Sequence, residues 1–132
     1  MRTVFVDTSA WFALVDGKTS EHREIVDIMR GYRDRLVTSD YVFDETVTLL
    51  RSRRSWSLAR KAGELLRSGA VAKLVRLGPD DIEAAWSVFC SRPDQRLSFT
   101  DCTSFVLMRR LEIETAISLD DDFRALGLTT LP

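Results

Sequence analysis

The chain has 132 residues, 45% of them hydrophobic, so it is long enough to bury one core and leaves little room for a second domain. Nineteen basic and twenty acidic residues give a net charge of -1, so overall charge does not indicate a nucleic-acid binder, and a basic surface would need local clusters. No apolar run approaches the roughly 20 residues of a membrane span and the first residues lack a signal-peptide pattern, so we expect a soluble, cytoplasmic protein.

The first half of the chain alternates short apolar runs with helical patterns. The apolar run of residues 4–6 is typical of a strand buried on both faces, and Thr8 or Ser9 can cap the helix that follows, which includes Trp11 and Leu14. Further along, the sequence predicts a helix over residues 20–32, a strand over 36–38, a helix over 41–53 capped by Ser39, and a basic helix over 57–67 closed by Gly69.

The second half continues this alternation. It predicts a strand over residues 71–77, helices over 80–90 and 101–111, a strand over 115–119, one or two helical turns in DDDFRAL, and a short strand over 129–131. Short apolar strands that alternate with helices indicate a parallel sheet covered by helices on both faces. We expect a single domain over residues 1–132.

Two acids directly follow predicted strands. Asp7 comes after the run VFV, and Asp120 follows the run of residues 116–119. Parallel strands end at the same edge of a sheet, and sites form beyond that edge where the strand order reverses. Both acids are therefore expected at one functional edge of the sheet.

Two further acids lie on predicted helices. At about 100° per residue, Glu45 falls beside Leu49 on the border of the apolar face of its helix, whereas the adjacent Asp44 points away. Asp101 shares a stripe with Phe105 and occupies the first turn of its helix, where the helix dipole favours an anion. We therefore expect Glu45 and Asp101 to face inward.

Each acid also has an ordinary structural explanation. Asp7 can be a turn acid, Asp101 fits a capping box with Ser98, and Glu45 can be a border residue whose stem packs against Leu49. Together, however, four such carboxylates with no matching inward lysine or arginine would repel one another, and a divalent cation resolves that repulsion. Oxygen ligands alone favour Mg²⁺ or Mn²⁺ over zinc.

Histidine and cysteine chemistry is not indicated. His22 lies at a predicted helix start and is expected to be solvated, while Cys90 and Cys102 lack CxxC spacing and are expected to be reduced, semi-buried thiols. A carboxylate site with Mg²⁺ or Mn²⁺ instead suits phosphodiester hydrolysis, because a metal-bound water supplies the nucleophile and a second ion can stabilise the leaving oxygen.

Four segments, in this order, span almost the whole chain: VFVDTSAWFALVD, TSDYVFDETVTLLR, LSFTDCTSFVLMRRL and AISLDDDFRALGLTTLP. Through them the chain resembles the PIN-domain ribonucleases, and in particular the VapC-type toxins of bacterial and archaeal toxin-antitoxin pairs. The resemblance implies a three-layer α/β/α sandwich with a short central parallel sheet and an endoribonuclease that binds Mg²⁺ or Mn²⁺. It also implies a homodimer and a cognate VapB-type antitoxin whose tail occupies the active-site groove.

The resemblance assigns roles to particular residues. The four acids match the family's catalytic and metal-binding positions: Asp7 in VDTS, Glu45 in VFDE, Asp101 in FTD and Asp120 in SLDDDF. Asp122 could replace or assist Asp120 around a second metal. Three hydroxyl residues resemble those that steady ligands or metal-bound waters, although each could equally be a helix cap: Thr8, Ser9 and Thr100.

The basic segment RSRRSWSLARKAGELLR is a candidate substrate surface. Its cations can track phosphates while Trp56 stacks on a base, and the same groove could hold an acidic antitoxin tail. The segment could equally be a solvated helix face, with Trp56 in a hydrophobic core or a subunit contact. The candidate groove residues are Arg51, Arg53, Arg54, Arg60 and Lys61.

Other functions are compatible with parts of this pattern. An aspartyl-phosphate phosphatase would need a second aspartate two positions after Asp7, where this chain has Ser9. A housekeeping PIN-type RNA-processing nuclease without an antitoxin remains an alternative. So does a catalytically silent module of the same fold that binds RNA or protein.

Overall fold

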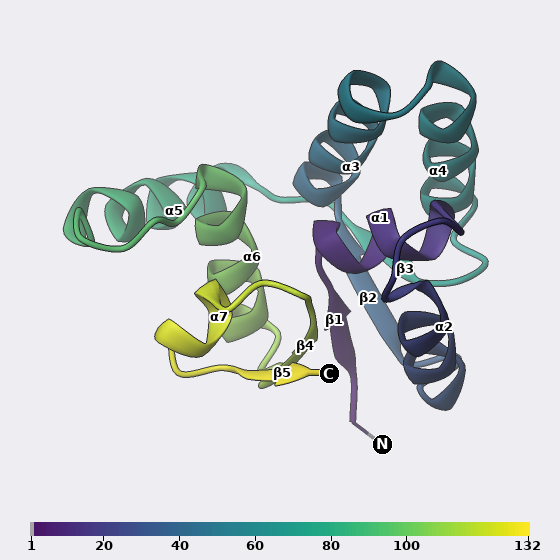
Figure 1. The fold of residues 1–132 in the computed structure, drawn as a ribbon. Helices are drawn as coiled ribbons and strands as arrows, with labels where there is room; N and C mark the ends of the chain where they lie inside the picture. The colour runs from purple at the N-terminus through teal and green to yellow at the C-terminus, as the bar shows by residue number, and fades with distance from the viewer. Residues whose placement is uncertain (1) are drawn as a thin grey trace.

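A computed structural model describes residues 2–132, which form five strands and seven helices (Figure 1). The strands are β1 (Val4–Val6), β2 (Leu36–Ser39), β3 (Lys73–Val75), β4 (Thr115–Ile117) and β5 (Thr129–Leu131). The helices are α1 (Thr8–Val15), α2 (His22–Gly31), α3 (Asp40–Arg53), α4 (Trp56–Ser68), α5 (Pro79–Ser91), α6 (Phe99–Arg110) and α7 (Asp122–Ala125). None of the described helices combines the length and the apolar character that a bilayer span requires.

The strands form one parallel sheet in the order β3-β2-β1-β4-β5. The chain leaves central β1 toward β2 and β3 and then crosses back to β4 on the other side of β1. Because right-handed crossovers in opposite directions place their helices on opposite faces, α1 to α4 lie on one side of the sheet and α5 to α7 on the other (Figure 1). The predicted three-layer sandwich is confirmed, and its strand order reverses between β1 and β4.

The main core packs the helices of both layers against the sheet, and α1 contributes its largest side chain. Every residue of β1 is buried, and Trp11 of α1 is fully buried against the sheet. The Trp11 Nε1–H donates to Thr38 Oγ1 at 3.1 Å, and the Thr38 hydroxyl donates to the Val6 carbonyl oxygen at 3.1 Å. These two bonds satisfy buried polar atoms and fix the start of α1, and therefore Asp7, over the ends of β1 and β2.

The helix starts agree with the predicted caps in two cases and differ in one. Ser39 Oγ accepts from the Val42 N–H, and Ser98 and Asp101 make the reciprocal bonds of a capping box. At α1 the N-cap residue is Asp7, and neither Thr8 nor Ser9 acts as the cap. The predicted cap is wrong there because both residues already belong to the helix, which frees the Ser9 hydroxyl for bonds to Asp7 and to the Leu119 N–H.

The environments of the histidine and the two cysteines differ from those expected from the sequence. His22 is half-buried rather than solvated, and its Nδ1 lies 2.7 Å from the Ala13 carbonyl oxygen. Cys102 is fully buried in α6 and Cys90 is exposed on α5; both are free thiols. The packing of neighbouring elements decided these environments.

Helices α5 and α6 pack on each other and form a small apolar cluster of their own. The Arg110 guanidinium makes two bonds to the buried Asp81 carboxylate, at 2.8 and 2.9 Å, and this lowers the pKa of Asp81. On α5, Trp86 and Phe89 are 55% and 41% exposed and stack with ring centroids 5.6 Å apart. The pair therefore presents an aromatic surface.

Candidate functional site

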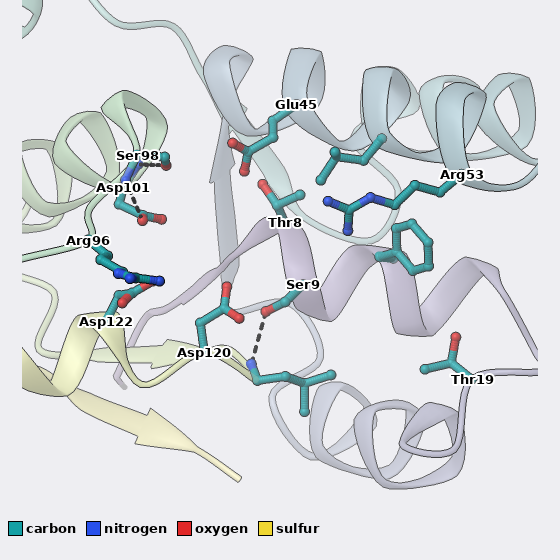
Figure 2. A pocket seen from close by; sticks show the side chains of 13 residues that line it. Thr8, Ser9, Thr19, Glu45, Arg53, Arg96, Ser98, Asp101, Asp120 and Asp122 are labelled. Carbon is teal, nitrogen blue, oxygen red and sulfur yellow. Dashed lines mark hydrogen bonds between the residues drawn. The ribbon is translucent and has the colours of Figure 1, made fainter.

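A cavity of about 550 Å³ opens beyond the carboxyl ends of β1 and β4, where the strand order reverses (Figure 2). Its polar lining consists of four acids, four hydroxyl residues and two arginines: Glu45, Asp101, Asp120, Asp122, Thr8, Ser9, Thr19, Ser98, Arg53 and Arg96. These side chains come from α1, α3, α6 and α7 and from the loops beside them. Three of the four predicted acids, Glu45, Asp101 and Asp120, therefore meet at this cavity. Asp7 is not one of the lining residues, but the charges of Asp101 and Asp120 act on it.

Asp7 is only 1% exposed and lies directly after β1. Its Oδ2 accepts hydrogen bonds from the hydroxyls of Ser9, at 3.1 Å, and Ser118, at 3.0 Å, while its Oδ1 is buried and has no hydrogen-bond partner within residues 2–132. Burial, followed by the charges of Asp101 and Asp120, raises the pKa of Asp7 to about 7. One oxygen of a buried carboxyl group is thus left without the partner that a charged form requires.

Asp101 serves two roles at the start of α6. Its Oδ2 accepts from the Ser98 N–H at 3.0 Å in the capping box, and its side chain also lines the cavity (Figure 2). Burial raises the pKa of Asp101 to about 6, with Asp122 and Glu45 adding to the shift and hydrogen bonds from Ser98 opposing it. The ordinary capping explanation and the site assignment therefore apply to the same side chain.

Glu45, Asp120 and Asp122 line the same cavity as Asp101. Glu45 points into it from α3, whereas the neighbouring Asp44 is exposed, as the helical angle predicts (Figure 2). Burial, then the charges of Asp122 and Glu45, raises the pKa of Asp120. Asp122 lines the cavity beside Asp120, while the intervening Asp121 is 91% exposed and pairs with Arg124. Both candidates for the fourth position, Asp120 and Asp122, are thus at the cavity.

The donor set fits a hard divalent cation. The cavity lining holds carboxylate and hydroxyl oxygens and no histidine or cysteine, and the partnerless Oδ1 of Asp7 is an oxygen that a cation would satisfy. Within residues 2–132, no three acidic, histidine or cysteine side chains are grouped closely enough to bind one ion as they stand. Mg²⁺ commonly retains several water ligands, and these can bridge such gaps.

The supporting hydroxyl residues differ from one another. Thr8 and Ser9 line the cavity, and Thr8 Oγ1 is buried without a partner. Thr100 does not line it, and its carbonyl oxygen accepts from the Thr103 hydroxyl. Ser118, which also contacts Asp7, was missed by sequence reasoning because it falls inside the predicted strand of residues 115–119 and carries no motif of its own.

Of the predicted groove residues, the structure brings only Arg53 to the cavity. Arg54 binds Asp16 at 2.6 Å, Arg60 binds Glu64 at 2.9 Å, Arg51 is exposed on α3, and Lys61 borders a separate hollow near Asp16. The second cavity cation, Arg96, comes from the loop between α5 and α6. Sequence reasoning missed Arg96 because only the packing of α5 on α6 sets where this loop lies.

Comparison with known proteins gives consistent results. The family model described as PIN domain matches residues 4–128. The chain is 34% identical over 124 residues to the 23S rRNA-specific endonuclease VapC20 of Mycobacterium tuberculosis, covering 94% of each protein. It is 29% identical over 117 residues to ribonuclease VapC26 of the same organism, covering 89% of this chain and 86% of that protein.

Solved structures agree. The crystal structure of Mycobacterium tuberculosis VapC20, described as a Sarcin-Ricin loop cleaving toxin, matches with a TM-score of 0.91 and 31% identity, covering 96% of this chain and 97% of that one. PAE2754 from Pyrobaculum aerophilum matches with a TM-score of 0.68 and 18% identity, covering 98% and 89%. The second match supports the fold alone.

Proposed function

Because the chain belongs to the PIN-domain family, we propose that it is a Mg²⁺- or Mn²⁺-dependent endoribonuclease and the toxin of a toxin-antitoxin pair. The observation that carries this proposal is the set of acids around one cavity, with the buried Oδ1 of Asp7 lacking any partner. We propose further that residues 1–132 act as one nuclease domain in the cytoplasm, where RNA substrates are found. The names of its relatives make 23S rRNA the first substrate to test.

Asp7, Glu45, Asp101 and Asp120 would hold the cation, with Asp122 as the candidate for a second ion. A bound Mg²⁺ or Mn²⁺ lowers the pKa of a water molecule and offsets the negative charge of the phosphate. The chain supplies the rest. Burial of Asp7 and Asp101 strengthens their interaction with a cation, and the hydroxyls on Asp7 Oδ2 restrict the rotation of that carboxylate.

Cleavage of total RNA by the purified protein, in Mg²⁺ or Mn²⁺ and in EDTA, tests the proposal. The wild type is expected to give discrete fragments that EDTA abolishes. Glu45→Gln should lower the rate by at least about two orders of magnitude, because even substitutions outside the ligand shell cost roughly 10- to 100-fold at metal sites. Asp44→Asn, on the adjacent exposed residue, is the matched control and should cleave like the wild type.

Two results would contradict the nuclease assignment. One is the absence of cleavage by folded wild-type protein with metal, tested on total RNA and on intact ribosomes. The other is equal cleavage by wild type and Glu45→Gln. Either result would favour the silent binding module of the same fold.

Arg53 and Arg96 are proposed to bind phosphates of the RNA on either side of the acids. Both line the cavity, and within residues 2–132 neither forms a salt bridge, whereas four other arginines do. Arg53→Ala or Arg96→Ala should weaken RNA binding by about tenfold, the usual scale for one hydrogen bond to a charged group. Each should also reduce the slope of the logarithm of the binding constant against the logarithm of the salt concentration by about one, which is the contribution of one phosphate contact.

Fluorescence anisotropy with labelled RNA, in the Glu45→Gln background to prevent cleavage, measures this effect. Arg51→Ala, on an exposed arginine of the same helix outside the cavity, is the matched control. Equal weakening by Arg51→Ala and Arg53→Ala would indicate general charge attraction and would remove the specific assignment.

The proposal includes two partners, a cognate VapB-type antitoxin and a second copy of the chain. If the chain has no antitoxin, the alternative is a housekeeping nuclease. Co-expression with the neighbouring open reading frame, followed by a growth assay, separates the two cases.

The exposed aromatic pair Trp86 and Phe89 supports a protein contact at α5. Light scattering of the wild type and of Trp86→Lys tests the dimer, which the substitution should convert to monomer.

A further inference from the structure

Ser118 follows β4 directly and is only 2% exposed. The Ser118 Oγ donates to Asp7 Oδ2 at 3.0 Å, and the Ser118 Oγ also accepts from the Asp120 N–H at 3.1 Å. A serine hydroxyl has one proton and two lone pairs, so both bonds can form together. Ser118 therefore joins the acid at the end of β1 to the backbone of the acid that follows β4.

Ser9 makes the matching connection from α1. Its Oγ donates to Asp7 Oδ2 at 3.1 Å and accepts from the Leu119 N–H at 2.9 Å. The two serine oxygens lie 3.3 Å apart. Two hydroxyls thus converge on one oxygen of Asp7, and each holds one of two consecutive backbone amides in the segment that leads to Asp120.

This arrangement distinguishes the two oxygens of Asp7. Oδ2 accepts both hydroxyl protons, whereas Oδ1 is buried and has no partner. A carboxylate held through one oxygen cannot rotate freely, so the other oxygen keeps a fixed direction. The connection also sets the position of the Asp120 backbone relative to Asp7.

We propose that Ser118 is a positioning residue of the metal site, which keeps Asp7 Oδ1 available for the cation and fixes Asp120 beside it. This inference rests on the proposed nuclease function and concerns the same site. Ser118 acts through Asp7 and Asp120 and does not itself contact substrate.

The experiment compares Mn²⁺ affinity by titration calorimetry for the wild type, Ser118→Ala and Ser118→Thr. Ser118→Ala is expected to raise the Kd for Mn²⁺ by roughly 10- to 100-fold, the range found when partners of metal ligands are removed. Ser118→Thr keeps the hydroxyl and should bind Mn²⁺ more tightly than Ser118→Ala. If Ser118→Ala does not fold, Ser118→Cys, of nearly the same size and with a weaker donor, replaces it under the same criterion.

Ser104→Ala is the matched control for loss of a buried serine. Ser104 is fully buried in α6, and its hydroxyl has no hydrogen-bond partner. It should leave Mn²⁺ affinity unchanged, whatever it does to the free energy of unfolding.

The outcomes separate this inference from the proposed function. Wild-type protein that binds Mn²⁺ and cleaves RNA, beside a Ser118→Ala variant with wild-type Mn²⁺ affinity, would overturn the role of Ser118 alone. Wild-type protein that neither binds Mn²⁺ nor cleaves RNA would overturn both. A lowered Mn²⁺ affinity shared equally by Ser118→Ala and Ser104→Ala would assign the effect to general destabilisation and overturn the positioning role.

Discussion

Asp7→Asn is expected to abolish RNA cleavage and, in EDTA at pH 8, to make the folded protein more stable than the wild type. Cleavage is expected to be lost because the neutral amide no longer supplies the negative charge that attracts the cation. The gain in stability comes from removing a buried carboxylate whose Oδ1 has no partner within residues 2–132. Without a cation, ionising this group inside the protein costs free energy, as the rise of its pKa from 3.8 to about 7 indicates. An amide of the same shape carries no charge, which removes a cost on the order of a few kcal/mol, and the buried NH₂ group without an acceptor offsets part of that gain.

The stability difference should depend on pH in a defined way. Below about pH 3 the Asp7 carboxyl is largely protonated in both the folded and the unfolded chain, so the advantage of Asp7→Asn should disappear there. Chemical denaturation in EDTA at about pH 3 and pH 8 measures this. Asp44→Asn, on an exposed acid, is the control and should change stability little at either pH. An Asp7→Asn variant that is equally destabilised at both pH values would contradict the explanation.

Raising the pH from 5 to 8 in EDTA is expected to destabilise the wild-type protein. In the unfolded chain, Asp7 and Asp101 ionise near the ordinary aspartate pKa of 3.8, whereas in the folded protein their pKa values are about 7 and about 6. Between these limits the folded state binds more protons, so the free energy of unfolding falls as pH rises, by up to about 1.4 kcal/mol per pH unit for each group. The melting temperature should fall by several degrees.

Asp16 and Asp81 make the protein more stable as the pH rises, but only over a lower pH range. Arg54 lowers the pKa of Asp16 and Arg110 lowers that of Asp81, so their contributions are complete above about pH 5. The decline between pH 5 and 8 is therefore assigned to Asp7 and Asp101. Millimolar Mn²⁺ should reverse it, because a ligand that binds only the folded state raises its stability.

Thermal melts at a series of pH values, with EDTA or with Mn²⁺, test this second prediction. The Asp7→Asn, Asp101→Asn double variant should show a much flatter pH dependence and little response to Mn²⁺. A wild-type melting temperature that rises between pH 5 and 8 in EDTA would show that these acids do not carry the raised pKa values.

The sequence by itself determined the elements that carry the site. Period and apolar pattern located the strands before Asp7 and Asp120, and the helical angle separated Glu45 from Asp44, because side-chain direction within one element follows from its backbone geometry. The parallel sheet and its two helical layers followed from the alternation of strands and helices. The expectation that the four acids meet followed from these positions, and the resemblance assigned them catalytic and metal-binding roles.

Only the tertiary structure decided which side chains from different elements touch. The Ser118 hydroxyl reaches Asp7 because β4 pairs with β1, and Arg96 reaches the cavity because α5 packs on α6. Arg54 and Arg60 share a basic segment with Arg53 but bind nearby carboxylates instead. Contacts between distant segments depend on packing and register, and a local pattern carries no record of either.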